Sequence, residues 1–426
     1  MFIDIFEEII DIMHHDYAGA KDKQGWDHPE EYRQKIKRLD GSTERESELF
    51  CKLVKEYLLD FKDQHLSFHH VKAASRTYCG FKTRRYQNAL YITESISEKN
   101  FQAGDKITAL DGEGISELAI RHKKDLYGEA EERQNWSDIL KLYNEATVEK
   151  PDGHARKQAL KKYPVVPYSP QYSAEKLDNG IVKMTLTDFD NADAIRKLIG
   201  EVEPLLCSSR VLIMDVRINY GGADSAFLGL LPFIFPVGVT TIIPDDLYPM
   251  EMNYTKRNVE LRSKEFLEFI QITEDKGSVD FFNHCLREMQ ANKGKGFQKY
   301  VHQRSGQSID IQGRKNPEQI FILSDVACGS SGDSFVDVCK LSKKVTVVGR
   351  ATAGLNDYAN LAEQTWKEEF KLQYATSRMM SVDKGEGMQG KGIVPHVHIP
   401  WKPEHIGTDV DLLYCLEAAD SSKVCK

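Results

Sequence analysis

The sequence predicts an α/β protein whose largest domain is built on a parallel β-sheet. Three short apolar runs, at residues 211–214, 320–323 and 345–348, have the composition of strands that are buried on both faces. Stretches with helical periodicity separate these runs, as the connections of a parallel sheet require. The composition agrees with a globular chain, because 41% of the 426 residues are hydrophobic and 29% are charged.

Three regions follow one another along the chain. Residues 1–75 are predicted to be helical, because apolar side chains recur there at helical spacing. Residues 76–172 contain short alternating stretches and glycine turns, which predict a small β-rich domain. Residues 173–426 form the predicted α/β domain, which carries a charged helical insertion at about residues 247–304.

The charge balance and the cysteines indicate which partners the protein can bind and in which compartment it works. Aspartate and glutamate number 65 against 57 lysines and arginines, so a net charge of −8 offers no basic field for nucleic acid. The eight cysteines include no C-x-x-C pair, which favours free thiols in a reducing compartment. Acidic residues interrupt the apolar N-terminal stretch, and prolines and glycines interrupt the charge-free stretch 225–244. We therefore expect neither a signal peptide nor a membrane span, and a cytoplasmic protein.

Two loops that follow predicted strands carry the residue types of a nucleophilic site. The first loop ends in Gly221 and Gly222, which allow a positive φ and a close approach of backbone N–H groups to a ligand. The second loop, CGSSGDS, places Ser330 and Ser331 at the predicted start of a helix. A serine there can attack a carbonyl carbon while backbone amides stabilise the oxyanion. The same residues would also suit a helix cap and two tight turns.

Five segments favour the catalytic alternative because they match one family in chain order. They are DQH at 63–65, DVRINYGG at 215–222, SSGDSF at 330–335, VVGRATAG at 347–354 and GKGIVP at 390–395. These segments resemble the D-x-H, D-x-R-x-N-x-G-G, S-A-G-E-x-F, V-V-G-E-x-T-x-G and G-x-G-I-x-P motifs of the tail-specific, C-terminal-processing serine peptidases. The similarity is greatest to the tricorn-like branch. It implies a ClpP/crotonase-like peptidase core, preceded by a helical N-terminal segment and a PDZ-like domain.

The resemblance assigns the chemistry to three residues. Ser330 is the implied nucleophile and His65 the implied base, because the lysine base of another branch is replaced here by Ala351. Gln389 stands where the family has a glutamate. Its amide oxygen can orient the imidazole, but it brings no charge to stabilise imidazolium. Glu386 is an alternative carboxylate for this role.

The resemblance also implies how substrate is bound. The N–H groups of Gly221 and Ser331 would form the oxyanion hole, and Gly222 would contact the substrate. Gly80 and Phe81 lie in the sequence YCGF, where a PDZ domain binds a terminal carboxylate. The predicted function is that of a serine endopeptidase acting on peptides or unfolded protein tails. No cofactor is expected, and a homo-oligomer is left open.

Two alternative functions and one rival nucleophile remain from the sequence. An acyl-thioester enzyme of the crotonase type would share the fold, but only the paired oxyanion amides favour it. Because Gln389 lacks a charge, the chain could be a weak or inactive scaffold that binds peptides or other ligands on the same fold. Cys328, two residues before Ser330, is a rival nucleophile. His396 and His398 alternate onto one strand face but lack a third ligand in the sequence, so we expect no metal site.

Overall fold

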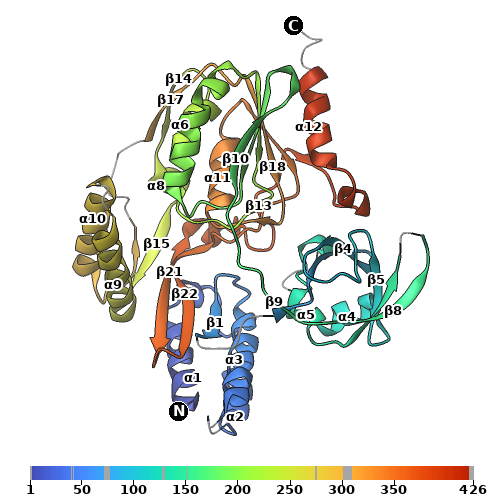
Figure 1. Ribbon diagram of the computed structural model, residues 1–426. Coiled ribbons are helices and arrows are strands. Elements are labelled where there is room, and N and C mark those ends of the chain that lie inside the picture. The colour runs from blue at the N-terminus through green and yellow to red at the C-terminus, as the bar shows by residue number, and fades with distance from the viewer. Residues whose placement is uncertain are drawn as a thin grey trace. The chain divides into compact units, whose positions relative to one another are not determined.

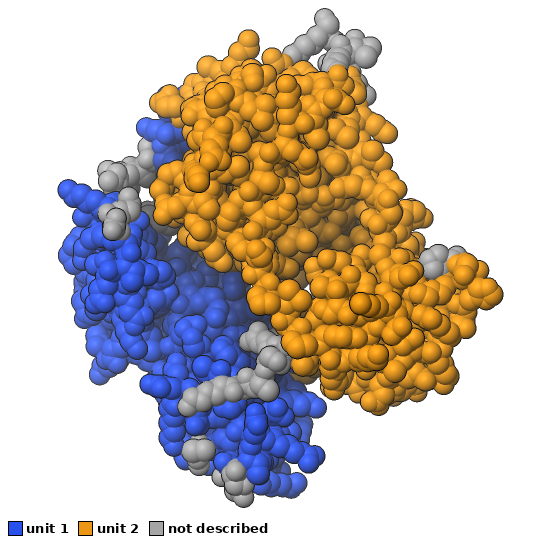
Figure 2. Space-filling view, in the orientation of Figure 1, with its two compact units in different colours: residues 1–73, 239–311, 355–389 blue, residues 74–238, 312–354, 390–426 orange. Residues whose placement is uncertain are grey.

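The chain forms two compact units in the computed structural model, and Figure 2 shows them in different colours. Unit 1 consists of residues 1–73, 239–311 and 355–389, and unit 2 of residues 74–238, 312–354 and 390–426. The structure describes residues 2–39, 41, 43–71, 77–126, 130–150, 152–273, 276–300 and 309–421. The expected boundary at residues 75 and 76 lies outside this range, and the three-part division predicted from the sequence stays a prediction.

A six-stranded sheet forms the centre of unit 2. All neighbouring strands are parallel except β10 and β11. Their spatial order is β10 (Tyr172–Lys176), β11 (Ile181–Leu186), β12 (Val211–Asp215), β18 (Gln319–Ser324), β20 (Val345–Gly349) and β23 (Val397–His398). The three apolar runs of the sequence therefore form adjacent buried strands. The predicted mixed α/β class is confirmed.

Three helices lie between or after these strands along the chain, and Figure 1 shows them beside the sheet. They are α6 (Ala192–Ser208), which follows β11, α11 (Ser331–Lys340), which follows β18, and α12 (Val410–Ser421) near the end of the chain. Since parallel strands point the same way, the loops after β12 and β18 leave the same edge of the sheet. This topology brings the glycine loop and the serine loop to one place.

The β-rich region of unit 2 has its own antiparallel sheet. The strands are β3 (Phe81–Tyr86), β4 (Ala89–Ser95), β5 (Lys106–Leu110), β7 (Glu145–Glu149) and β8 (Ala155–Ala159), with β6 (Glu113–Gly114) paired to β5. The helices α4 (Ile115–Arg121) and α5 (Ser137–Leu140) accompany this sheet. Trp136, Leu90 and Ile107 are among the side chains of its core. The domain is β-rich as expected, and its identity as a PDZ-like domain stays a prediction.

Unit 1 combines helices with a second antiparallel sheet. The helices of the N-terminal segment are α1 (Phe2–Asp11), α2 (Pro29–Ile36) and α3 (Glu44–Leu58). The strand order is β1 (Ser67–His70), β22 (Phe370–Met379), β15 (Met250–Tyr254) and β16 (Gly296–Lys299), while β21 (Tyr358–Trp366) pairs with β22. The expected charged insertion supplies β15, β16, α9 (Lys256–Ile272) and α10 (Lys276–Asn292). Among the described residues, no helix is long and apolar enough to cross a membrane.

Candidate active site

Ser330 lies at a sharp turn between a strand and a helix. It follows β18 and the short strand β19 (Ala327–Cys328), and it directly precedes α11. Its backbone has φ +57° and ψ −122°, a conformation that costs a non-glycine residue about 1–3 kcal/mol. Asp333 Oδ2 accepts the Ser330 N–H at 2.9 Å, which fixes the turn. A strained strand-to-helix turn of this kind is typical of a nucleophilic serine above a parallel sheet.

The glycine loop packs directly against this turn. β13 (Ile218–Asn219) pairs in parallel with β19. Ser331 Oγ donates a hydrogen bond to the carbonyl oxygen of Gly222 at 2.7 Å. A Cβ atom on Gly221 would lie 2.6 Å from Ser330 Cβ, which is closer than non-bonded carbons approach. The structure therefore brings together Ser330, Ser331, Gly221 and Gly222, the four residues that the sequence placed on these loops.

The contact between Gly221 and Ser330 makes one substitution informative. Gly221→Ala should lower kcat/KM by at least about 100-fold, because the added Cβ must displace the serine and the backbone keeps φ +82°. The free energy of unfolding should fall by only about 1–3 kcal/mol. Peptidase assays and thermal melts measure the two effects. Gly200→Ala, on α6 with open space around the new Cβ, is the control and should leave activity unchanged. Full activity in Gly221→Ala would contradict this close contact.

The backbone N–H groups around Ser330 differ in whether a hydrogen bond within the protein already engages them. The N–H of Gly221 donates to Oδ1 of the buried Asn219 at 3.0 Å, so it is already engaged. Among the hydrogen bonds of the described residues, none uses the N–H of Gly222. Ser331 is the first residue of α11, and the first N–H groups of a helix have no acceptor within it. The geometry thus offers Gly222 and Ser331 as donors, whereas the sequence predicted Gly221 and Ser331.

His65 belongs to unit 1 and has a fixed ring. Its side chain is 9% exposed, and its Nδ1 lies 2.7 Å from the backbone carbonyl oxygen of Tyr358. Because a carbonyl oxygen can only accept, Nδ1 must carry the proton of the neutral ring. The lone pair is then on Nε2, which is the tautomer that a general base needs.

Gln389 does not make the hydrogen bond to the imidazole that the sequence predicted. The carbonyl of Tyr358 occupies that position at Nδ1. The backbone N–H of Gln389 instead donates to Oδ2 of the buried Asp357 at 2.8 Å, and Oδ1 of the same carboxylate accepts the N–H of Met388. Glu386, the alternative carboxylate, is exposed, and its backbone N–H bonds to the Ser381 carbonyl. The carboxylate near the ring is that of Asp63, whose Oδ1 lies 4.0 Å from Nδ1.

The rival nucleophile and the conceivable metal ligands have other roles. Cys328 is fully buried, and this burial raises the pKa of its thiol well above the ordinary value, which disfavours the reactive thiolate. Nδ1 of His396 accepts the N–H of Val347 at 2.9 Å, and burial lowers the pKa of this histidine. In the part of the chain that the structure describes, no group of three or more histidine, cysteine or acidic side chains is arranged to hold a metal ion.

The predicted terminus-binding loop is ordered by its own backbone. Gly80 has φ +83°, and its carbonyl oxygen accepts the N–H groups of Ile96 and Ser97 at 2.9 and 2.8 Å. The Phe81 side chain is buried against Phe101, so it belongs to the domain core. Within the described sheet, β3 is a terminal strand that pairs with β4.

Two arginines of the β-rich domain bind the segments next to the serine turn. Arg84 forms two hydrogen bonds with Asp325, at 2.7 and 2.8 Å, and Arg350 contacts the same carboxylate at 2.6 Å. Both guanidinium groups lower the pKa of Asp325 against the effect of burial, so this carboxylate remains charged. Arg133 donates to the carbonyl oxygen of Thr352 at 2.7 and 2.9 Å. The β-rich domain is therefore tied to the backbone that precedes and flanks Ser330.

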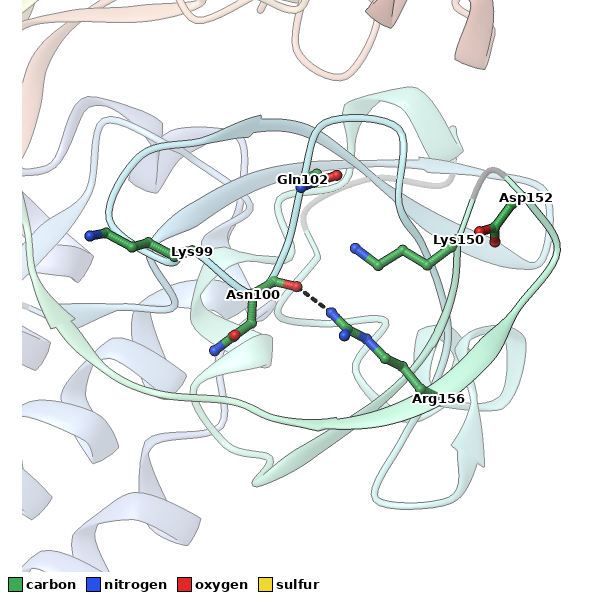
Figure 3. A pocket seen from close by; sticks show the side chains of 6 residues that line it. All are labelled: Lys99, Asn100, Gln102, Lys150, Asp152 and Arg156. Atoms are coloured by element: carbon green, nitrogen blue, oxygen red, sulfur yellow. Dashed lines mark hydrogen bonds between the residues drawn. The ribbon is translucent and has the colours of Figure 1, made fainter.

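A separate pocket of about 540 Å³ lies on the β-rich domain (Figure 3). Its lining consists of Lys99, Asn100, Gln102, Lys150, Asp152 and Arg156. Arg156 donates to the carbonyl oxygen of Asn100 at 2.6 Å, and Lys150 donates to the buried Asp105 at 2.6 Å. None of the lining residues is a predicted site residue, so this pocket is distinct from the serine turn.

Sequence reasoning missed the surroundings of the base. The partner of His65 is a backbone carbonyl, which no residue type reveals. Tyr17 and Lys23 lie behind Asp63, and Tyr17 donates to its Oδ2 at 2.7 Å. The available signal was weak: Tyr17 continues the apolar side of the first helix, and Lys23 is one of many lysines in the sequence. Burial alone distinguishes Lys23 from the others, and burial is a property of the fold.

Comparisons with known proteins identify the family and the fold. The model of peptidase family S41 matches residues 179–399, more than half of the chain. The fold is similar to that of mature CPAF complexed with lactacystin, with a TM-score of 0.65 and 11% identity over 100% of this chain and 98% of that one. Mature CPAF alone gives a TM-score of 0.64 at 11% identity, over 98% and 96% of the two chains.

A third structure, the photosystem II D1 C-terminal processing protease, gives a TM-score of 0.46 at 12% identity over 95% of this chain and 94% of that one. No curated protein matches the sequence. The likeness to CPAF shows a shared fold, and the family model shows the family. The chain therefore belongs to peptidase family S41 and is a serine-type peptidase.

Proposed function

We propose that the chain is an endopeptidase that hydrolyses peptides or protein C-terminal tails, with Ser330 as nucleophile and His65 as base. The observation that carries this proposal is the strained backbone of Ser330, at φ +57° and ψ −122°, beside two glycines. Such strain persists only where the surrounding structure enforces it, and it gathers at reactive sites. Ser330 and His65 belong to different compact units, so their pairing is part of the proposal.

The proposed reaction follows from the groups at each position. Ser330 Oγ attacks the scissile carbonyl carbon as its proton passes to Nε2 of His65. The N–H groups of Gly222 and Ser331 stabilise the oxyanion, because the N–H of Gly221 is engaged by Asn219. The imidazolium then protonates the leaving amine, and water hydrolyses the acyl-enzyme by the same sequence of proton transfers.

Labelling with a fluorophosphonate tests the nucleophile independently of the substrate. We expect one modified residue, Ser330, to be found by peptide mass spectrometry of the full-length protein. Ser330→Ala should abolish labelling, whereas Ser334→Ala, a serine on the first turn of α11, should retain it. Labelling of a different residue, or none at all with a folded protein, would contradict the proposal.

A second candidate is a binding scaffold with little or no catalysis. The observation in its favour is Gln389, since the imidazole has no carboxylate hydrogen-bonded to Nδ1 among the described residues. Such a chain would bind peptides tightly and resist fluorophosphonate. The labelling experiment therefore separates the two candidates.

Substrate capture by the β-rich domain is a further part of the proposal. If the loop containing Gly80 and Phe81 binds a terminal carboxylate, amidating the C-terminus of a peptide should weaken its binding to Ser330→Ala about 10- to 150-fold. Isothermal titration of the acid and the amide measures this ratio. Equal affinities would show that the loop does not bind the terminal carboxylate.

A further inference from the structure

A buried lysine lies close to the residues that contact the proposed base, His65. Lys23 is 2% exposed, and lysine is almost never buried to this degree without a partner. Its Nζ donates to the hydroxyl of Tyr17 at 2.9 Å and lies 4.1 Å from the centre of the Tyr358 ring. The backbone carbonyl of this same Tyr358 holds His65 Nδ1. The lysine therefore contacts Tyr17 and also Tyr358, the residue whose carbonyl oxygen binds the imidazole.

The contacts continue from Tyr17 to the carboxylate beside His65. The hydroxyl of Tyr17 donates to Asp63 Oδ2 at 2.7 Å. Asp63 Oδ1 accepts the backbone N–H of His65 at 2.9 Å and lies 4.0 Å from its Nδ1. Tyr17 and Asp63 are both buried, at 0% and 4% exposure. Burial, and then the charge of Asp63, raise the pKa of the Tyr17 phenol well above its ordinary value, so it remains a neutral donor.

We infer that Lys23, Tyr17 and Asp63 form a positioning network that places a negative charge behind His65. This inference rests on the proposed role of His65 as the base. A separation of 4.0 Å is too long for a hydrogen bond, but two opposite charges attract strongly at that distance in a site that excludes water. When Nε2 takes the proton of Ser330, Asp63 stabilises the resulting imidazolium and remains a carboxylate. No proton moves along the network.

The network supplies the negative charge that Gln389 lacks. Gln389 has no charge, and its backbone N–H donates to Asp357. Asp63 instead offers a full carboxylate, and Lys23 compensates for the cost of burying it. Lys23 opposes the imidazolium by its own charge, so the two residues act on the base with opposite signs.

Lys23 has other charged neighbours besides Asp63. Asp22, Asp357 and Lys62 act on it electrostatically together with Asp63, and burial is the largest effect, lowering the pKa of Lys23 to about 8. Asp22 accepts two hydrogen bonds from Arg378, at 2.7 and 2.8 Å, and one from the hydroxyl of Tyr358 at 3.1 Å. Asp357 accepts the backbone N–H groups of residues 388 and 389. Asp63 is thus the carboxylate whose oxygen lies nearest the imidazole among the described ion pairs of His65.

An NMR titration of the His65 ring tests the network without requiring catalysis. The full-length Ser330→Ala protein is labelled at histidine, and the His65 signal is identified by its absence in His65→Gln. Asp63→Asn should move the midpoint of the titration to lower pH by about one unit or more, since the opposite charge is lost. Lys23→Met should move it to higher pH by about 0.5 unit, since a competing positive charge is lost. Lys23→Gln, which keeps a donor for Tyr17, should act in the same direction if the methionine variant does not fold.

Lys344→Met is the matched control. Burial also lowers the pKa of Lys344 to about 8, but among the described residues its Nζ donates to backbone carbonyls, including that of Phe233 at 2.7 Å. This variant should leave the His65 midpoint unchanged. Shifts of opposite sign in Asp63→Asn and Lys23→Met support the network, because a purely structural role predicts no such pattern. An unchanged midpoint in either variant, or shifts of the same sign, would overturn it. If Ser330 were not the nucleophile, the labelling experiment would fail while this titration still reported on the network.

Discussion

Replacing Ser330 by alanine should lower kcat/KM by about 10⁴-fold or more and leave the fold intact. The reason is that every later step of the reaction depends on the covalent bond that Oγ forms. At this half-buried position the substitution removes one capping hydrogen bond from the Asp333 N–H, which is worth about 1 kcal/mol. The melting temperature should stay within a few degrees of the parent's. Initial rates on a quenched fluorescent peptide and a thermal melt measure the two quantities.

A second substitution at the same position separates chemistry from strain. Ser330→Gly should be equally inactive but more stable than Ser330→Ala by about 1 kcal/mol, because glycine adopts φ +57° without a steric penalty. Ser334→Ala is the control and should keep its activity. If Ser330→Ala retained more than about a hundredth of the parent's rate, another residue would have to be the nucleophile.

The second large effect is expected at the base. His65→Gln should reduce kcat/KM about 10⁴-fold, since no other group would then take the proton of Ser330 Oγ. The remaining rate should no longer fall at acidic pH in the way that titration of an imidazole base produces. A pH profile of kcat/KM between pH 5 and pH 9 measures this.

A neighbouring histidine provides the control for this variant. His69 lies four residues further on, in β1, and the sequence alone could confuse the two. His69→Gln should change kcat/KM by less than about twofold. The opposite result, an active His65→Gln and an inactive His69→Gln, would transfer the role of base to His69.

The sheet and the two loops could be predicted because their signals are local. Buried parallel strands have a composition of their own, and 211–214, 320–323 and 345–348 show it. The glycine pair and the serine segment follow those strands, and parallel topology brings their loops to one edge. The α/β class and the serine-type peptidase family could therefore be predicted from the sequence.

The partners of individual groups could not be predicted, because they are set by contacts over long separations in the chain. The sequence assigned the N–H of Gly221 to the oxyanion hole, but this N–H donates a hydrogen bond to the Asn219 side chain. It assigned the orientation of His65 to Gln389, but a backbone carbonyl of β21 makes that hydrogen bond. Lys23 became notable only when its burial was known. In each case the residue type was visible and its neighbour was not.

The hydrogen bond between His65 and Tyr358 also sets a time order during synthesis. These two residues are 293 positions apart in the chain, and unit 1 needs segments that end only at residue 389. At translation rates of about 5–20 residues per second, about 15–60 seconds pass between the synthesis of His65 and that of Tyr358. Until then the Tyr358 carbonyl cannot fix the tautomer of the ring, so a growing chain would carry Ser330 before its proposed base is complete. On the proposed mechanism, the order of segments along this chain therefore delays peptidase activity until synthesis has passed residue 358.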